Sequence, residues 1–443
     1  MPNPILPLWE YIPDGEPRVF GDRVYLYGSH DTVGTDKFCD YKLKVWSASI
    51  HNLNEWQCHG DSFRTRDGER KADTPWTNRE LYAPDVVEKD GKYYLYAYIV
   101  GSKGAIGVSD KPEGPFQLLS QYIYDEKTEV GDDGIFNDAG VLVDDDGKVY
   151  VYYGFEASNM NELNPATMCD VLPGSYMHSV IDDRQEIPEE RRFYEASSPR
   201  KVGDTYYLIY SPRRGNRLAY ATAKSPKGPF IYRGYIVDNG EDYPAGNNHG
   251  SICCIDGQWY IFYHRMTNNT CMSRRACVER ISILEDGTIP TVEMTSLGFE
   301  ESLNPYQITP AEIACVLKGG CYVTEKDLFT RVVTNITDAC IVGYKYFDFG
   351  DDYTGDHLTF CMKVRGMGTP CKVRILLDDA NDGKEVGVLS IGTGDGLYKT
   401  KVENITGRHA LYFIVEHGIE PSWISYAFEG KQLLEMVEFV FMK

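Results

Sequence analysis

Hydrophobic and polar positions alternate in one arrangement that recurs along the first two thirds of the chain. A glycine and one or two polar residues precede a short, tyrosine-rich apolar stretch, as in GDRVYLYGS and GKYYLYAYI. Alternation with a period of two predicts a β-strand, and glycine beside Asp or Lys favours the tight turn of a hairpin. The arrangement begins at Gly21, Gly91, Gly147, Gly203 and Gly257.

The spacing of these hairpins predicts the architecture. Successive glycines are 70, 56, 56 and 54 residues apart, and Ile106–Phe116 and Leu218–Phe230 add a further strand that ends in Gly-Pro-Phe. Units of about 55 residues with three or four strands each predict a five-bladed β-propeller. The period of two excludes helical solenoids, and near-constant spacing disfavours the alternative, a pair of β-sandwiches with chance hairpins.

The repeat stops before the end of the chain. Residues 295–310 read as a linker, and short alternating strands such as VRILLDD and HALYFIVE follow them. This pattern is typical of a β-sandwich. We therefore expect an all-β chain, with the propeller over residues 1–305 and a β-sandwich of jelly-roll type over residues 306–443.

Composition and charge exclude several classes of partner. Lys and Arg number 45 against 66 Asp and Glu, a net charge of −21, which argues against nucleic acid or an anionic membrane as a partner. No apolar run reaches the length of a membrane-spanning helix. The 12 cysteines form no CxxC pair and favour reduced thiols. The N-terminus lacks the pattern of a signal peptide, so we expect a cytoplasmic protein, or a secreted one if a leader has been removed.

Charged residues stand at equivalent places before each repeat glycine. Each lies six to nine residues upstream, at the start of the first strand of its hairpin. In a propeller the innermost strands line the axis, so residues at their common end converge on one place. Capping of a turn is the alternative for any single one of them. The residues are Asp14, Asp85, Asp138, Glu195 and His249.

Clustered carboxyl groups predict acid–base chemistry. Ionising two neighbouring carboxyl groups costs Coulomb energy, so one can stay protonated as a general acid while another stays ionised as a base. Hydrolysis of a glycosidic bond requires such a pair. Four carboxyl groups and an imidazole also suit a calcium or manganese site, which is the competing hypothesis.

The segments around these residues resemble glycoside hydrolase family 43, whose members are five-bladed propellers that act on arabinose- and xylose-containing polysaccharides. The resemblance spans roughly residues 5–300 and rests on the order and spacing of short motifs. These are PDGEPRVFGDRVYLY at Asp14, YAPDVV at Asp85, FNDAGVLVDDDGK at Asp138, YEASSPRKVGDTYYL at Glu195 and NHGS at His249.

The resemblance implies roles for three carboxyl groups. Asp14 aligns with the general base, Glu195 with the general acid, and Asp138 with the residue that keeps the acid protonated and oriented. Gly15 departs from the usual Asp-Pro of the family and leaves Glu16 as the less favoured base. The implied reaction inverts the anomeric configuration, for which the two carboxyl groups stand about 6.5–9.5 Å apart to admit a water molecule.

The resemblance also implies binding residues. It requires no cofactor for the chemistry and places His249 at the propeller axis, beside a calcium ion, another cation or its waters. A substrate-binding arginine falls on Arg275, although a one-residue shift of register would exchange it for Arg274. Aromatic faces bind the C–H surfaces of sugars, and the candidates for a pocket wall are Trp76, Phe38 and Tyr194.

The C-terminal part resembles a family 6 carbohydrate-binding module. The resemblance rests on Cys340–Gly350, Lys372–Asp378 and Gly407–Gly418, and Trp423 is a candidate sugar platform. The alternative is a sandwich that only buttresses the propeller, which a cytoplasmic location favours.

The function that we expect is exo-acting hydrolysis that releases terminal α-L-arabinofuranosyl or β-D-xylosyl residues. The substrates would be oligosaccharides or polysaccharides of the arabinoxylan, arabinan or xylan type. An endo-acting arabinanase and a non-catalytic carbohydrate-binding propeller are alternatives, and the second is disfavoured because all three carboxyl positions are filled. Retaining, fructose-releasing propellers usually show Asn-Asp-Pro and Arg-Asp-Pro, and neither tripeptide occurs.

Overall fold

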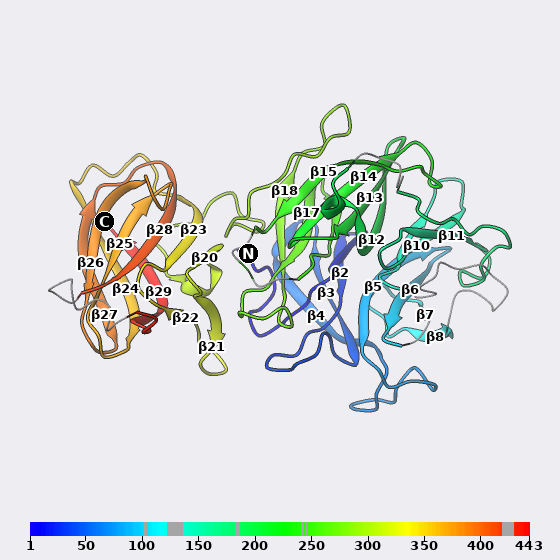
Figure 1. Ribbon diagram of the computed structural model, residues 1–443, viewed down its shortest axis with the longest axis horizontal. Coiled ribbons are helices and arrows are strands. Elements are labelled where there is room, and N and C mark those ends of the chain that lie inside the picture. Colours follow the sequence, from blue (N-terminus) through cyan, green and yellow to red (C-terminus); the bar gives the residue numbers. More distant parts are fainter. Residues whose placement is uncertain (102–103, 122–135, 182–186, 241–242, 244–245, 419–428) are drawn as a thin grey trace.

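The strands form two bodies, with β1–β18 in one and β20–β29 in the other (Figure 1). The computed structural model describes residues 1–443 except 102–103, 122–135, 182–186, 241–242, 244–245 and 419–428. The chain is all-β, as expected: a five-bladed propeller followed by a β-sandwich. Its described helices are the short 3₁₀ segments η1 (Glu189–Arg191) and η2 (Ala311–Ile313), and none of them is long enough to cross a membrane.

Five antiparallel sheets are the blades, and within each sheet the strands pair in chain order. Their strands are β1 (Glu16–Phe20), β2 (Arg23–Gly28), β3 (Lys42–Ser49) and β4 (Asn52–Arg64); β5 (Leu81–Lys89), β6 (Lys92–Ile99), β7 (Ala105–Ser109) and β8 (Gln117–Ser120); β9 (Gly140–Val143), β10 (Val149–Tyr153) and β11 (Asn159–Leu163); β12 (Phe193–Val202), β13 (Thr205–Pro212), β14 (Arg217–Ala223) and β15 (Ile231–Asp238); and β16 (Ser251–Ile255), β17 (Gln258–Arg265) and β18 (Arg275–Ile281).

The repeat glycines form the turn between the first two strands of every blade. Each has a positive φ, between 54° and 82°, which glycine adopts without the steric penalty that a Cβ atom brings. The tyrosine-rich stretch after each glycine is the second strand, and its side chains fill the space between neighbouring blades. Tyr96 of β6 and Val151 of β10, for example, belong to one buried apolar cluster.

Buried polar contacts join the blades around the axis. Arg18 of β1 donates to Asp85 of β5 at 2.6 Å and to the carbonyl of Val141 in β9 at 2.9 Å, so Asp85 has a structural role. Glu16 pairs with Arg200 of β12 at 2.6 Å. A parallel bridge between Gly15 and Gly250 connects the first blade to the last, which closes the ring.

Two sheets packed on an aromatic core make up the C-terminal sandwich. Tyr344, Phe360, Phe413 and Phe439 are buried between them. The boundary predicted at residues 305/306 falls between the last propeller strand and β19. The strands are β19 (Thr309–Pro310), β20 (Val316–Lys318), β21 (Tyr322–Glu325), β22 (Arg331–Ile336), β23 (Ile341–Asp348), β24 (His357–Gly366), β25 (Cys371–Leu377), β26 (Lys384–Ile391), β27 (Gly396–Glu403), β28 (Arg408–His417) and β29 (Leu434–Met442).

A polar cluster joins the sandwich to the propeller at the start of β18. The buried guanidinium of Arg275 lies 2.6 Å from the hydroxyl of Tyr11, 2.6 Å from Thr267 Oγ1 and 3.2 Å from Glu325 Oε1 of β21. Tyr11 also donates to Glu325, and Asn268 donates to its other carboxylate oxygen at 3.1 Å. Glu325 therefore brings the compensating charge for an arginine of the propeller.

We expect the substitution Glu325→Ala to lower the free energy of unfolding by about 2 kcal/mol, because it leaves the buried Arg275 without its counter-charge. The control is Glu385→Ala, which removes the half-exposed Glu385–Arg374 pair and should change the free energy by about 0.5 kcal/mol. Urea unfolding measures both variants. Equal losses in the two would contradict the importance of this contact.

Candidate active site

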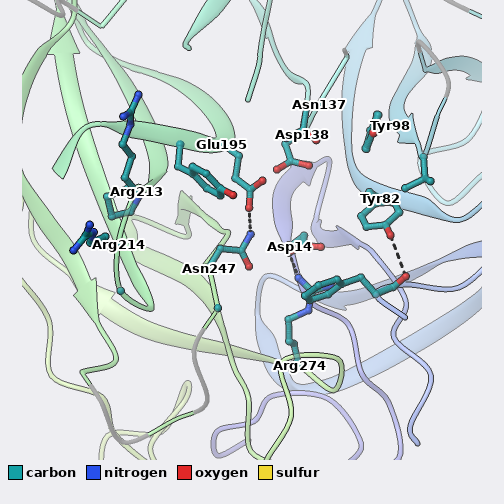
Figure 2. Close-up of a pocket in the computed structure, with 16 residues that line it drawn as sticks. Asp14, Tyr82, Tyr98, Asn137, Asp138, Glu195, Arg213, Arg214, Asn247 and Arg274 are labelled. Carbon is teal, nitrogen blue, oxygen red and sulfur yellow. Dashed lines mark hydrogen bonds and ion pairs between the residues drawn. The ribbon is translucent and has the colours of Figure 1, made fainter. Parts of the chain in front are cut away.

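One pocket gathers the charged residues that precede the inner strands. It has a volume of about 600 Å³ and opens where the first strands of the blades begin (Figure 2). Asp14 precedes β1, Asp138 precedes β9, Glu195 lies near the start of β12, and Arg274 directly precedes β18. All four line the pocket, so the repeat brings together side chains that are up to 260 residues apart in the sequence.

The backbone at these positions is held in an uncommon conformation. Asp14, Asp138 and Ala196 have φ values of 57°, 47° and 67°, in the left-handed region that costs a non-glycine residue about 1–3 kcal/mol. Hydrogen bonds hold it there. The amide of Ala196 donates to Asp138 Oδ2 at 3.2 Å, and the amide of Asp14 donates to Nδ1 of His264 at 3.4 Å. This conformation aims the carboxyl groups into the pocket.

Asp14 is the ionised carboxylate of the pocket. Its Oδ1 accepts from Nη1 of Arg274 at 2.8 Å, and its Oδ2 accepts from Ser29 Oγ at 2.6 Å. Burial alone would raise the pKa of Asp14, but the charges of Arg274 and His249 outweigh it and lower the pKa below its ordinary value. Asp14 therefore carries a negative charge at neutral pH and is able to accept a proton.

Glu195 is the protonated carboxyl group. It is buried, and desolvation together with the neighbouring Asp138 raises its pKa to about 8. The amide Nδ2 of Asn247 donates to its Oε1 (Figure 2). Burial also raises the pKa of Asp138, while His249, 4.0 Å away, lowers it. The pocket thus holds a carboxylate and a carboxylic acid at the same pH.

Arg274, and not Arg275, is the arginine of the pocket. Besides Asp14 it binds Asp31 with two contacts, Nε to Oδ2 at 2.9 Å and Nη2 to Oδ1 at 3.0 Å. Successive side chains at the start of a strand point to opposite faces, so Arg275 turns away toward Tyr11 and Glu325. The structure places Arg275 outside the pocket in which the prediction had placed it.

Two of the three aromatic candidates line the pocket and the third does not. Phe38 and Tyr194 line the pocket, whereas Trp76 lies in a separate hollow with Thr65 and Asn78 and packs on the core of the second blade. The prediction that Trp76 forms a wall of the pocket is therefore wrong. The less favoured base, Glu16, also lies outside the pocket, paired with Arg200.

Several pocket residues were missed in the sequence. Tyr82 lies in the YAPDVV motif but was not named as a binding residue, and its hydroxyl donates to the carbonyl of Phe38 at 3.2 Å. Asn247 stands two residues before His249, so its motif was found but its own contact was not. No periodic signal marks the others, which lie at the ends of strands or in the loops that follow them: Tyr98, Val100, Asn137, Arg213 and Arg214.

His249 lies close to three carboxyl groups. Burial lowers the pKa of its imidazole, but Glu16, Asp138 and Asp14 outweigh burial and raise the pKa to about 9. Its Nε2 is 3.5 Å from Glu16 Oε1, and its Nδ1 is 4.0 Å from both Asp14 Oδ1 and Asp138 Oδ2. The buried Nδ1 has no hydrogen-bond partner in the described part of the chain. No three His, Cys, Asp or Glu side chains of that part are grouped to hold a metal ion. A protonated imidazole has no lone pair for a metal ion, so these residues do not fit a cation bound directly by His249.

Comparison with known proteins gives a consistent result. Residues 1–289 match the family described as Glycosyl hydrolases family 43. The chain is 39% identical over 464 residues to a xylosidase/arabinosidase from Thermoclostridium stercorarium, and the alignment covers 93% of this chain and 95% of that protein.

Solved structures are similar in fold as well. A β-xylosidase/α-arabinofuranosidase from a compost microbial metagenome, solved with xylotriose in a calcium-free form, is 29% identical with a TM-score of 0.57, covering 66% of this chain and 98% of its own. An arabinoxylan arabinofuranohydrolase from Bacillus subtilis, solved with cellotetraose, is 24% identical with a TM-score of 0.56, covering 100% and 97%. At that identity the second likeness shows the fold alone.

We expect Asp138→Asn to lower the pKa of Glu195 from about 8, because it removes a neighbouring negative charge, while burial, the larger cause, keeps the pKa above that of an ordinary glutamate. Glu195 would then lose its proton at a lower pH. The ¹³C NMR titration of its carboxyl carbon, assigned by difference with Glu195→Gln, measures this shift. The exposed Asp145→Asn is the matched control and should leave the titration unchanged. An unchanged titration in Asp138→Asn would show that Asp138 does not act on Glu195.

Proposed function

The chain belongs to glycoside hydrolase family 43, and from this premise we propose that it is an inverting, exo-acting enzyme that releases terminal α-L-arabinofuranosyl or β-D-xylosyl residues from hemicellulose-derived oligosaccharides. The observation that carries the proposal is the pair of opposite protonation states in one pocket. Asp14 is ionised and Glu195 is protonated at the same pH, as the hydrolysis of a glycosidic bond by two carboxyl groups needs, and membership of the family supports inversion.

In the proposed mechanism the two carboxyl groups act at the same time. Glu195 donates its proton to the glycosidic oxygen as the bond to the anomeric carbon breaks. Asp14 removes a proton from a water molecule, whose oxygen attacks the anomeric carbon from the other face. Asp138 keeps Glu195 protonated before the reaction. At the end Asp14 carries the proton and Glu195 the negative charge, and exchange with solvent restores both.

The pocket favours a small, neutral sugar at the reacting position. Arg274 is hydrogen-bonded to Asp14 and Asp31. Its other N–H groups therefore lie beside the general base, where they are able to donate to sugar hydroxyl groups. Phe38 and Tyr194 offer apolar faces for C–H groups. The name of the relative from Thermoclostridium stercorarium contains both xylosidase and arabinosidase, which supports a pentose in either ring form. Substrates of the arabinoxylan, arabinan or xylan type are therefore proposed.

A cofactor has no part in the proposed proton transfers. The charged imidazole of His249 supplies positive charge beside Asp14 and Asp138 and helps to keep Asp14 ionised. For the C-terminal domain we propose a buttressing role, supported by the contact of Glu325 with Arg275. Its resemblance to a carbohydrate-binding module stays a prediction, and the candidate platform Trp423 lies outside the described residues.

Removal of the general acid tests the mechanism. We expect Glu195→Ala to reduce kcat on xylobiose or an arabinosylated xylo-oligosaccharide by about 10³-fold, because these leaving groups need a proton. The loss on a p-nitrophenyl pentoside should be much smaller, because p-nitrophenolate leaves without one. The control Glu385→Ala should behave as the unmodified enzyme. Hydrolysis of a p-nitrophenyl pentoside and of the oligosaccharide by Glu195→Ala at unchanged rates would refute the assignment.

The stereochemistry of the product is a second test. We expect the first-formed pentose to have the anomeric configuration opposite to that of the substrate, because the water attacks directly and no sugar–enzyme bond forms. ¹H NMR in the first minutes of hydrolysis, before mutarotation, records it. A product of retained configuration would exclude Asp14 as a base that activates water.

A further inference from the structure

Asn247 contacts the general acid but has no part in the proton transfers described above. It lies in the segment before β16, lines the pocket and turns its amide nitrogen to Glu195 Oε1 (Figure 2). In a protonated carboxyl group one oxygen carries the proton and the other only accepts. An N–H group that donates to Oε1 therefore leaves Oε2 as the oxygen that carries the proton.

His264 fixes the backbone that carries Asn247. Its Nε2 lies 3.1 Å from the carbonyl oxygen of Asn247, and its Nδ1 lies 3.4 Å from the amide nitrogen of Asp14. The carbonyl can only accept and the amide can only donate, so the imidazole carries its proton on Nε2. The backbone N–H of His264 also donates to Asn248 Oδ1 at 3.1 Å. The buried imidazole of His264 thus connects the backbone of Asp14, the base, to that of Asn247, which binds the acid Glu195.

On the basis of the proposed function, we propose that Asn247 is a positioning residue that assigns the transferable proton of Glu195 to Oε2, and that His264 holds Asn247 in register with Asp14. Without the amide, the carboxyl group of Glu195 is able to turn about its last torsion and to present either oxygen to the substrate. Asp14 and Glu195 then no longer keep fixed positions relative to each other. Proton donation to the glycosidic oxygen and attack by water are therefore less often aligned at the same moment.

The charges around Glu195 predict the direction in which its pKa changes when Asn247 is replaced. Asp138 and Asp14 face it and raise its pKa, whereas His249 and the amide of Asn247 lower it. A donated N–H bond stabilises the ionised form of a carboxyl group. Loss of the amide should therefore raise the pH at which Glu195 loses its proton, the opposite of the effect of Asp138→Asn.

The test is the substitution Asn247→Ala, with kcat and KM measured across pH on xylobiose and on a p-nitrophenyl pentoside. We expect kcat on xylobiose to fall about tenfold or more, with a much smaller loss on the p-nitrophenyl substrate, and the basic limb of the pH profile to move to higher pH. His264→Ala should move the limb in the same direction. Asn247→Asp keeps the size of the side chain but loses the donor, so it should move the limb at least as far.

The control is Asn161→Ala. Asn161 is a buried asparagine of β11 that accepts a hydrogen bond from Tyr153 at 2.6 Å, outside the pocket. Its loss should lower stability without moving the pH limb or changing the ratio of the two substrates.

Three results would overturn the proposal. A basic limb that moves to lower pH would show that Asn247 faces Glu195 with its oxygen. Equal losses on both substrates with an unmoved limb would show a packing role only, as would a response no different from that of Asn161→Ala. Failure of the proposed function itself has another signature, since Glu195→Ala would then not distinguish the two substrates.

Discussion

Charge burial at the propeller axis is the constraint on which the rest of the site depends. A carboxylate taken out of water needs a compensating cation or must take up a proton. The described part of the chain supplies guanidinium partners to several buried carboxylates. The pairs are Asp85 with Arg18, Glu16 with Arg200, and Asp14 and Asp31 with Arg274. Glu195 has no such partner there and instead faces Asp138, so it keeps its proton.

The same distribution of arginine partners determines which carboxyl group of the pocket is the acid and which is the base. Asp14 and Glu195 occupy comparable places at the start of a blade and are both buried. The difference between them is Arg274, which the fifth blade places beside the first. Because a propeller closes on itself, the last blade is also the neighbour of the first, and the bridge of Gly15 to Gly250 marks this closure. Ring closure therefore decides which carboxyl group is ionised.

Most of the architecture followed from the spacing of five glycines, and the structure shows why. Each is a turn with positive φ between strands whose tyrosines pack between blades, so local chemistry and global fold agree there. The convergence of Asp14, Asp138 and Glu195 followed from that symmetry alone. The domain boundary remains a prediction, although no described strand crosses it.

What could not be predicted depends on side-chain direction and on loops. A motif of two adjacent arginines does not say which one faces inward, because a shift of one residue in the register of the strand exchanges its two faces. Trp76 was placed by its nearness to YAPD along the chain, but the segment that carries it lines a separate hollow with Thr65 and Asn78. Tyr98 and Arg213 enter the pocket from the ends of strands, where no period applies.

The two adjacent arginines also connect the two bodies of the molecule. Arg274 turns inward to Asp14 and Asp31, and Arg275 turns outward to Tyr11 and Glu325, from consecutive positions at the start of β18. Each guanidinium needs its own carboxylate because both are buried. The sandwich supplies Glu325, the carboxylate that compensates the charge of Arg275. It therefore stabilises the start of β18, beside which Arg274 keeps the base Asp14 ionised. The C-terminal domain therefore contacts Arg275, which is the residue next to Arg274 of the active site.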